Sequence, residues 1–213
     1  MKKNTKSEIS SKMSFNIITI GDSGVGKTSI IRKYLYNIFD SNVFQTIGLN
    51  FSFKEVNIKN GEKVILKLID TAGQEKYNSL SKSYYKNSDG VLFVFDFNDE
   101  ESFENIRNWI SLFNENHNGK KGIPIYLIGN KSDLEKKVSK ESIDELIQET
   151  GYEFKELSAL NDDEIKFGEV FEEIAEKLYT IEKKYGNREQ KGKQISKYDE
   201  NNNNKKDCVC RFE

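Results

Sequence analysis

The feature that most constrains the fold is a glycine-rich stretch, GDSGVGKT, at residues 21–28. It follows a β-branched apolar run, Phe15–Ile20, and precedes a helical pattern, Ser29–Tyr36. In that context it matches the pattern GxxxxGK[ST], whose glycines let successive backbone N–H groups point inward at phosphate oxygens. The start of the following helix adds positive potential. The sequence therefore predicts a strand–loop–helix unit that binds the phosphates of a nucleoside triphosphate.

The pattern also assigns roles to single residues of this loop. Lys27 is expected to place a positive charge on the β- and γ-phosphates, and the Thr28 hydroxyl is a hard oxygen ligand for Mg²⁺. The predicted phosphate-binding residues are Ser23, Gly24, Val25, Gly26, Lys27, Thr28 and Ser29. The motif alone does not separate a kinase, an ATPase and a GTPase.

Short apolar runs alternate with helical patterns along the rest of the chain. Phe51–Ile58 and Lys63–Asp70 read as two strands of a hairpin, because Asn60-Gly61 between them tolerates positive φ. Gly90–Phe97 and Pro124–Gly129 are continuous apolar runs, which are typical of parallel strands buried on both faces. The predicted fold class is α/β: a three-layer P-loop domain with a six-stranded, mostly parallel sheet, one antiparallel strand, and helices on both faces.

The predicted helices have visible ends. Asp99 is expected to cap a helix whose apolar residues run from Phe103 to Phe113, and Ser139 a helix that ends at Gly151. A last helix carries an apolar stripe from Phe167 to Ile181. We interpret these stripes as core.

Length and composition favour one domain with polar ends. Of the 213 residues, 36% are hydrophobic and 32% charged, which is enough for one core. We expect a flexible extension at 1–12, the folded domain at 13–182 and a disordered tail at 183–213, since the tail is polar and includes an asparagine tract. A net charge of -2 gives no reason to expect nucleic acid as a partner.

The ends of the chain bear on targeting. The N-terminus has no apolar segment of the kind found in secretory signals, and the longest apolar stretch, Val91–Phe95, is too short to cross a bilayer. Cys208 and Cys210, the only cysteines, lie in the last six residues, so neither can bridge the core.

A second motif, Asn130-Lys131-Ser132-Asp133, follows a buried strand, and ligands of open α/β sheets bind at that edge. A carboxylate such as Asp133 accepts hydrogen bonds from both N1–H and the exocyclic amine of guanine, whereas adenine offers no such donor pair. Asn130 is placed to tie this loop to the phosphate loop, and the stem of Lys131 to cover the base. The pair of motifs predicts a guanine-nucleotide site.

From about Met13 to Ile181 the chain resembles a Ras-superfamily GTPase. Ser158-Ala159 is similar to the family's SAK loop, in which the alanine N–H meets guanine O6, but Leu160 stands in place of the lysine. Phe39 has the spacing from Lys27 at which the family places an aromatic edge against the base; an ordinary core phenylalanine is the alternative. The resemblance implies that GTP and GDP are the ligands.

Two further segments resemble the family's switches. Thr46-Ile47-Gly48 is similar to switch I, whose threonine ligates Mg²⁺ while the γ-phosphate is present. Residues 70–75, DTAGQE, resemble switch II. The resemblance implies that Asp70 contacts Mg²⁺ through water, that the Gly73 N–H binds the γ-phosphate, and that Gln74 orients the attacking water. Thr28, Thr46 and Asp70 are thus the predicted metal site.

No arginine finger within the chain is evident, so intrinsic hydrolysis is expected to be slow and to need an activating protein. Several segments look Rab-like, among them IGLNF at 47–51, QEKY at 74–77 and YYK at 84–86. Ile69, however, stands where Rabs usually carry a tryptophan that effectors read. The resemblance implies a monomer that meets an exchange factor, an activating protein, a GDP-dissociation inhibitor or escort protein, and effectors.

The C-terminal Cys208-Val209-Cys210 resembles the double-cysteine prenylation signal of Rabs. Lipidation there predicts a protein on the cytosolic face of intracellular membranes with a soluble cytosolic pool. Cys210 also lies four residues from the end, but Arg211 and Glu213 make a poor CaaX box. A redox or metal-binding CxC, or inert cysteines, are the rival interpretations.

Three classes of function remain open from the residues. The leading one is a GTP-hydrolysing switch in vesicle traffic. The others are a module that holds nucleotide with little turnover, and a Ras/Rap-type signalling GTPase, which only Ile69 favours. Trp109 and His117 carry no catalytic argument, and Trp109 is expected to pack within its helix.

Overall fold

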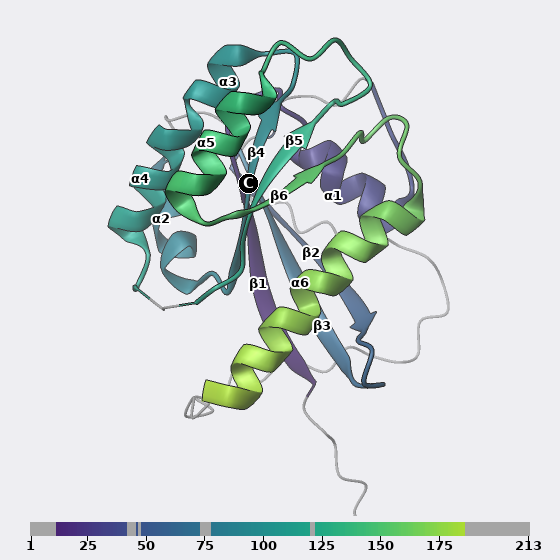
Figure 1. Ribbon diagram of the computed structural model, residues 1–213. Coiled ribbons are helices and arrows are strands. Elements are labelled where there is room, and N and C mark those ends of the chain that lie inside the picture. Colours follow the sequence, from purple (N-terminus) through teal and green to yellow (C-terminus); the bar gives the residue numbers. More distant parts are fainter. Residues whose placement is uncertain (1–11, 42–45, 47, 73–77, 120–121, 186–213) are drawn as a thin grey trace, which may run out of the picture.

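The computed structural model describes residues 12–41, 46, 48–72, 78–119 and 122–185, with the side chains of 78–82 also left undescribed. Six strands form one sheet in the order β2-β3-β1-β4-β5-β6 (Figure 1). Their bounds are β1 Met13–Ile20, β2 Leu49–Asn57, β3 Lys63–Thr71, β4 Gly90–Asp96, β5 Ile125–Asn130 and β6 Glu153–Glu156. The helices are α1 Lys27–Tyr36, α2 Asn78–Asn87, α3 Glu100–Glu104, α4 Ile106–Asn116, α5 Lys140–Thr150 and α6 Glu164–Tyr185.

The strand directions confirm the predicted mostly parallel sheet. All neighbouring pairs are parallel except β2 with β3, which are antiparallel from Leu49 opposite Thr71 to Asn57 opposite Lys63. The turn between these two strands holds Gly61 at φ 84°, a conformation that favours glycine. The hairpin places the start of β2 beside the end of β3, and the Ala72 N–H donates to the Gly48 carbonyl at 3.0 Å.

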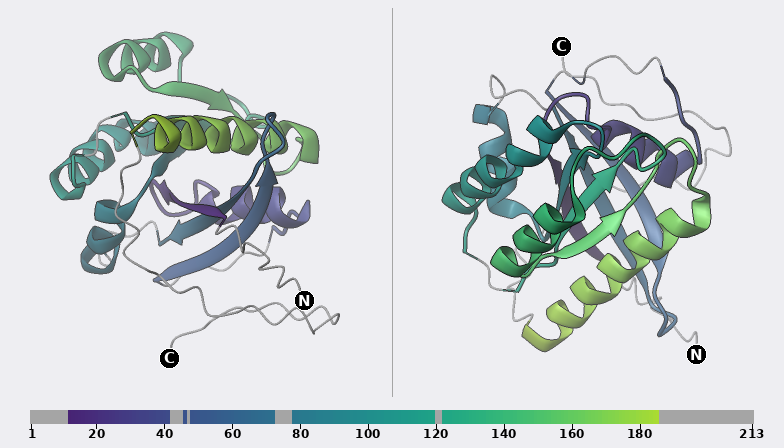
Figure 2. Two further views of the ribbon diagram at one scale, coloured as in Figure 1. Left: turned by 90° about the horizontal axis from the view of Figure 1, so that it is seen from below. Right: turned by 45° about the horizontal axis from the view of Figure 1, so that its top comes forward.

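Helices cover both faces of the sheet (Figures 1 and 2), and an apolar layer lies on each side. One layer packs α1 and α6 against the strands, with Tyr34 of α1 stacked on Phe171 of α6 at 3.8 Å between ring centroids. The other packs α2 to α5 against the opposite face, and Phe113 of α4 lies among its members. Every residue of β4 is buried, because this central strand is covered on both sides.

Some helix ends were predicted and others were not. The Ser139 hydroxyl caps α5 by accepting from the Ser142 N–H at 3.1 Å, and Gly151 ends it at φ 70°. The helix predicted after Asp99 is instead two short helices, α3 and α4, that meet at Asn105, whose dihedral angles (φ -68°, ψ -14°) remain in the right-handed helical region. The Asp99 side chain makes no capping hydrogen bond.

Two further differences lie in α2 and α6. α2 was not predicted, since its sequence shows no long apolar stripe. α6 continues to Tyr185, three residues beyond the expected domain end at 182. Among the described residues, no helix has the length and apolar character needed to cross a bilayer.

Candidate functional site

A hollow of about 400 Å³ opens at the carboxyl ends of β1, β3 and β5, where both predicted motifs meet. Its walls contain most of the residues predicted from the sequence: Ser23, Gly24, Gly26, Lys27, Thr28, Ser29, Phe39, Thr46, Asn130, Lys131, Asp133, Ala159 and Leu160. Four wall residues were not predicted: Asp40, Ser41, Thr71 and Leu134. The fold thus brings segments from five parts of the chain to one edge of the sheet.

The phosphate loop owes its shape to glycines in tight places. A Cβ at Gly21 would lie 2.1 Å from the Val94 carbonyl oxygen, and one at Gly26 would lie 2.2 Å from Asn130 Nδ2. Gly24, Gly26 and the loop start adopt positive φ angles that side chains disfavour. The loop therefore lies against β4 and the Asn130 side chain, with α1 beginning at Lys27.

Lys27 is a buried cation at the centre of this loop, only 5% exposed. Its ammonium donates to the carbonyls of Gly21 at 2.8 Å and Asp22 at 2.6 Å. Burial lowers its pKa to about 8, although the negative charges of Asp70 and Asp22 oppose that shift. A phosphate beside this ammonium would supply a negative charge that offsets the hydration lost on burial.

Three oxygen-bearing side chains converge next to Lys27. The Thr28 hydroxyl donates to Asp70 Oδ2 at 2.7 Å and lies 2.8 Å from the Thr46 hydroxyl. Burial raises the pKa of Asp70 to about 6, despite hydrogen bonds from Thr28 and the charge of Lys27. Asp70 Oδ1 is buried and has no hydrogen-bond partner among the described residues. This set of hard oxygens, with one orphaned carboxylate oxygen, fits a hydrated Mg²⁺.

The base loop is tied to the phosphate loop as the sequence predicted. Asn130 is buried, and its Nδ2 donates to the Val25 carbonyl at 2.8 Å. Ser158 lies behind the hollow and donates its hydroxyl to Asp133 Oδ1, which fixes that carboxylate. The Ala159 N–H donates to Asn130 Oδ1 at 3.2 Å, so it already has a partner where the resemblance implied guanine O6.

The rim of the base hollow is apolar. Phe39, Leu134 and Leu160 remain 39%, 46% and 50% exposed there. Phe39 is therefore a rim residue and not a core phenylalanine. Lys131, which adopts φ 59°, forms an ion pair with Asp96 at 2.6 Å, and this fixes the end of its side chain. Asp96 was not predicted as a site residue, because nothing in its own segment indicates a contact with Lys131, 35 positions later.

Four predicted site residues, Gly73, Gln74, Cys208 and Cys210, lie outside the described residues.

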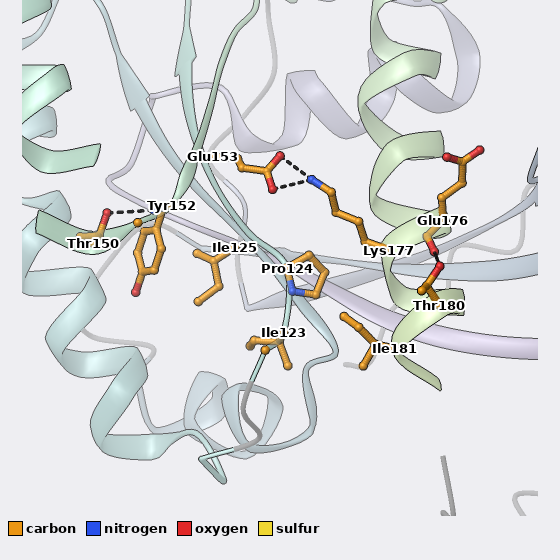
Figure 3. A pocket seen from close by; sticks show the side chains of 12 residues that line it. Ile123, Pro124, Ile125, Thr150, Tyr152, Glu153, Glu176, Lys177, Thr180 and Ile181 are labelled. Carbon is orange, nitrogen blue, oxygen red and sulfur yellow. Dashed lines mark hydrogen bonds and ion pairs between the residues drawn. The ribbon is translucent and has the colours of Figure 1, made fainter. Parts of the chain in front are cut away.

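A second, larger hollow of about 610 Å³ lies between the starts of β5 and β6 and the end of α6 (Figure 3). Its floor is formed by Ile123, Pro124, Ile125 and Ile181, and at its edge Lys177 points toward Glu153. The charges here are paired within the protein: Lys177 also contacts Glu173 at 2.7 Å and the Tyr126 hydroxyl at 2.7 Å. Size therefore does not mark the functional hollow, and the chemistry favours the smaller one.

Comparisons with known proteins agree with the site. The Ras family model matches residues 16–180. The Ras-related protein Rab-13 of Bos taurus is 42% identical over 147 residues, covering 68% of this chain and 71% of that protein. SEC4 of Saccharomyces cerevisiae is 40% identical over 160 residues, covering 75% and 72%. Rab-15 of Homo sapiens is 39% identical over 154 residues, covering 71% of each.

These relatives favour the Rab branch over the Ras/Rap alternative. A phosphate loop, a guanine-type base loop and a threonine–aspartate cluster at one sheet edge, together with these matches, identify the chain as a member of the Ras family, a Rab-like small GTPase that hydrolyses GTP.

Proposed function

We propose that this GTPase is a membrane-recruited switch in vesicle traffic, active with GTP and inactive with GDP. The observation that carries the switch is the contact of Thr28 and Thr46 at 2.8 Å beside Asp70. Thr28 belongs to the phosphate loop and Asp70 to the end of β3, whereas Thr46 comes from the segment before β2. A ligand that binds all three oxygens would hold that segment against the nucleotide, and its loss would release it.

Each residue of the nucleotide site has a separate proposed role. Lys27 neutralises the β- and γ-phosphates, and Asp133, held by Ser158, selects guanine by accepting from N1–H and the exocyclic amine. Bound Mg²⁺ would neutralise charge on the phosphates and would be held by Thr28, Thr46 and, through water, Asp70. Ser23, Gly24, Val25, Gly26 and Ser29 are proposed to contact phosphate, and Phe39, Asn130, Lys131, Ala159 and Leu160 to enclose the base.

Gly73 and Gln74 complete the proposal from the resemblance alone: the Gly73 N–H binds the γ-phosphate, and Gln74 orients the attacking water. Single-turnover hydrolysis by wild type and Gln74→Leu tests this role. We expect the variant to hydrolyse GTP at least tenfold more slowly than wild type, while its stability and GTP affinity stay like those of wild type. Equal rates would remove Gln74 from the mechanism while leaving nucleotide binding untouched.

We further propose that Cys208 and Cys210 carry prenyl groups, and that escort and GDP-dissociation-inhibitor proteins maintain a cytosolic pool. The support is the double-cysteine ending together with the Rab-like relatives. Intact mass after incubation with prenylating enzymes tests lipidation, with Cys208→Ser/Cys210→Ser as the control. A wild-type mass equal to the unmodified chain would reject it.

The regulators and effectors are proposed by the same resemblance. A pull-down with Gln74→Leu loaded with GTP, compared with wild type loaded with GDP, is expected to retain effectors only in the GTP state. Localisation of the same tagged variant would identify the membrane. Equal binding in both nucleotide states would contradict a switch.

A further inference from the structure

Asp22 is the second residue of the phosphate loop, and residues at the start of α4 hold its side chain. Its Oδ1 accepts from the indole Nε1–H of Trp109 at 2.5 Å, and its Oδ2 accepts from Asn105 Nδ2 at 2.8 Å. Both donors come from the start of α4, and a contact of either with the phosphate loop was not predicted from the sequence. Trp109 was expected only to pack within its helix, yet it makes a polar contact 87 positions away.

The donors are themselves fixed in place. The backbone N–H of Trp109 donates to the backbone carbonyl of Asn105 at 3.1 Å, so the two side chains lie one helical turn apart on one face. Asn105 Oδ1 accepts from Asn108 Nδ2 at 3.3 Å, which leaves its Nδ2 directed at Asp22. The indole is 7% exposed and packs in the apolar layer of α2 to α5. Asp22 therefore meets two donors whose positions do not depend on it.

The backbone carbonyl of Asp22 contacts a different partner from its side chain, the phosphate-loop lysine Lys27. This carbonyl accepts from Lys27 Nζ at 2.6 Å, so one residue is joined to α4 by its side chain and to the phosphate-binding lysine by its main chain. The charge of Asp22 also supports the charged form of Lys27 against burial. A loop lacking the α4 contacts would restrain this carbonyl less, and the carbonyl is one of the two that hold the ammonium.

We propose that Asp22, clamped by Asn105 and Trp109, is a positioning residue that sets the orientation of Lys27 and thereby slows nucleotide release. The clamp is defined as these three side chains. It acts through Lys27 and does not touch the nucleotide. It also joins the phosphate loop to α4, against which α2 packs through Tyr85 and Phe113 at 5.8 Å between ring centroids.

The test measures the dissociation rate of a fluorescent GDP analogue from the full-length protein in excess unlabelled GDP. Asp22→Ala, which removes both acceptors, is expected to accelerate release about tenfold, the scale of a lost charge-assisted hydrogen bond. Trp109→Phe keeps the ring but not the N–H, and Asn105→Ala removes the other donor; each is expected to accelerate release about threefold. These two single-donor variants carry the test if Asp22→Ala does not fold.

Two comparisons separate positioning from general stabilisation. Phe113→Leu, one turn further along α4 and outside the clamp, is the matched control, and it is expected to lower the melting temperature without changing GDP release. The double variant Asp22→Ala/Trp109→Phe is expected to release GDP no faster than Asp22→Ala, because Asp22→Ala already removes the hydrogen bond that Trp109→Phe would remove. Additive effects, equal acceleration by Phe113→Leu, or release by Asp22→Ala within twofold of wild type would each overturn the proposal.

A spectroscopic measurement checks the contact directly. Trp109 is the single tryptophan of the chain, so tryptophan emission reports on the surroundings of this indole, which include the clamp. Asp22→Ala is expected to shift its emission, because a carboxylate hydrogen-bonded to the indole is lost. An unchanged emission spectrum in a folded variant would show that the contact is not made in solution.

Discussion

Two regions at opposite ends of the sheet hold charged side chains in opposite electrostatic states, one buried and one half-exposed. At the nucleotide edge, burial lowers the pKa of Lys27 to about 8 and raises that of Asp70 to about 6, so each charged form is disfavoured. Where α6 meets β5 and β6, burial opposes ionisation of Glu173, but hydrogen bonds from Lys155 and Lys177 outweigh it and lower the pKa to about 2. There the pKa of Lys177 is raised.

The difference teaches how a binding site is distinguished from a structural network. Charges of the α6 network, defined as Tyr126, Glu153, Lys155, Glu173 and Lys177, satisfy one another without a ligand. At the nucleotide edge, Lys27 is held by carbonyl oxygens, and Asp70 keeps one oxygen without a hydrogen-bond partner among the described residues. Unfavourable burial of this kind is offset by a ligand, which marks the smaller hollow as functional.

The largest expected effect is on Lys27. Lys27→Met removes the buried charge that faces the phosphates, and GDP affinity should fall about a hundredfold or more, as for loss of strong charge-assisted hydrogen bonds. Isothermal titration with GDP checks this. Lys177→Met is the matched control: it removes an ammonium from the α6 network and should leave GDP affinity within twofold. A comparable loss in both variants would break the distinction between the two regions.

The pH dependence of GDP affinity is the next largest effect. Phosphate should hold the proton on Lys27 well above its free-state pKa of about 8, so binding above pH 8 takes up a proton. GDP affinity should therefore be nearly constant from pH 7 to 8. Above pH 8 it should decrease with a slope that approaches about tenfold per pH unit. Titrations from pH 7 to 10 measure this, and the same slope should remain in Lys177→Met. A flat profile to pH 10 would contradict the unfavourable burial of Lys27.

A smaller effect is expected on stability from the α6 network. Lys177→Met should lower the free energy of unfolding by about 1–2 kcal/mol, less than for a fully buried pair because water screens part of the network. Urea unfolding measures the loss. The control is Lys136→Met, which breaks the more exposed pair with Glu156 at 2.6 Å and should cost less than about 1 kcal/mol. Equal losses would show that the network adds nothing beyond a surface pair.

The smallest expected effect is the response of the α6 network to acid. The folded-state pKa of Glu173 is about 2, below its ordinary value of 4.5, so its stabilisation is complete above about pH 4.5 and is lost as the pH falls toward 2. Between pH 5.5 and 3, wild type should lose stability more steeply than Lys177→Met, which lacks one of the hydrogen bonds to Glu173. Parallel curves would remove Glu173 from the acid response.

The features that could be predicted from the sequence are those that depend on residues next to one another in the chain. The phosphate loop is recognised by its glycines and the base loop by the strand end before it, and Asn60-Gly61 predicts the hairpin. The hairpin register then brings the segment before Leu49 to the end of β3, which explains why Thr46 and Asp70 meet. The continuous apolar runs were sufficient to predict the parallel sheet, because parallel strands that are buried on both faces need apolar residues along their whole length.

The features that were missed depend on contacts between distant elements. Lys131 with Asp96, and Asp22 with Trp109, join residues whose own segments are explained without them. The break at Asn105 escaped the apolar spacing, because that spacing continues across both α3 and α4. No stripe revealed α2, which packs through Tyr85 against α4 and through Tyr84 against Phe51 of β2.

The β2–β3 hairpin has a consequence for how the state of the bound nucleotide is communicated. Leu49 pairs with Thr71 and the Ala72 N–H donates to the Gly48 carbonyl, so the segments before β2 and after β3 lie side by side at one end of the β2–β3 ladder. Displacing either strand there strains hydrogen bonds that it shares with the other. A protein that grips only one of the two segments thereby senses the other, and a small contact surface is enough to read the whole state.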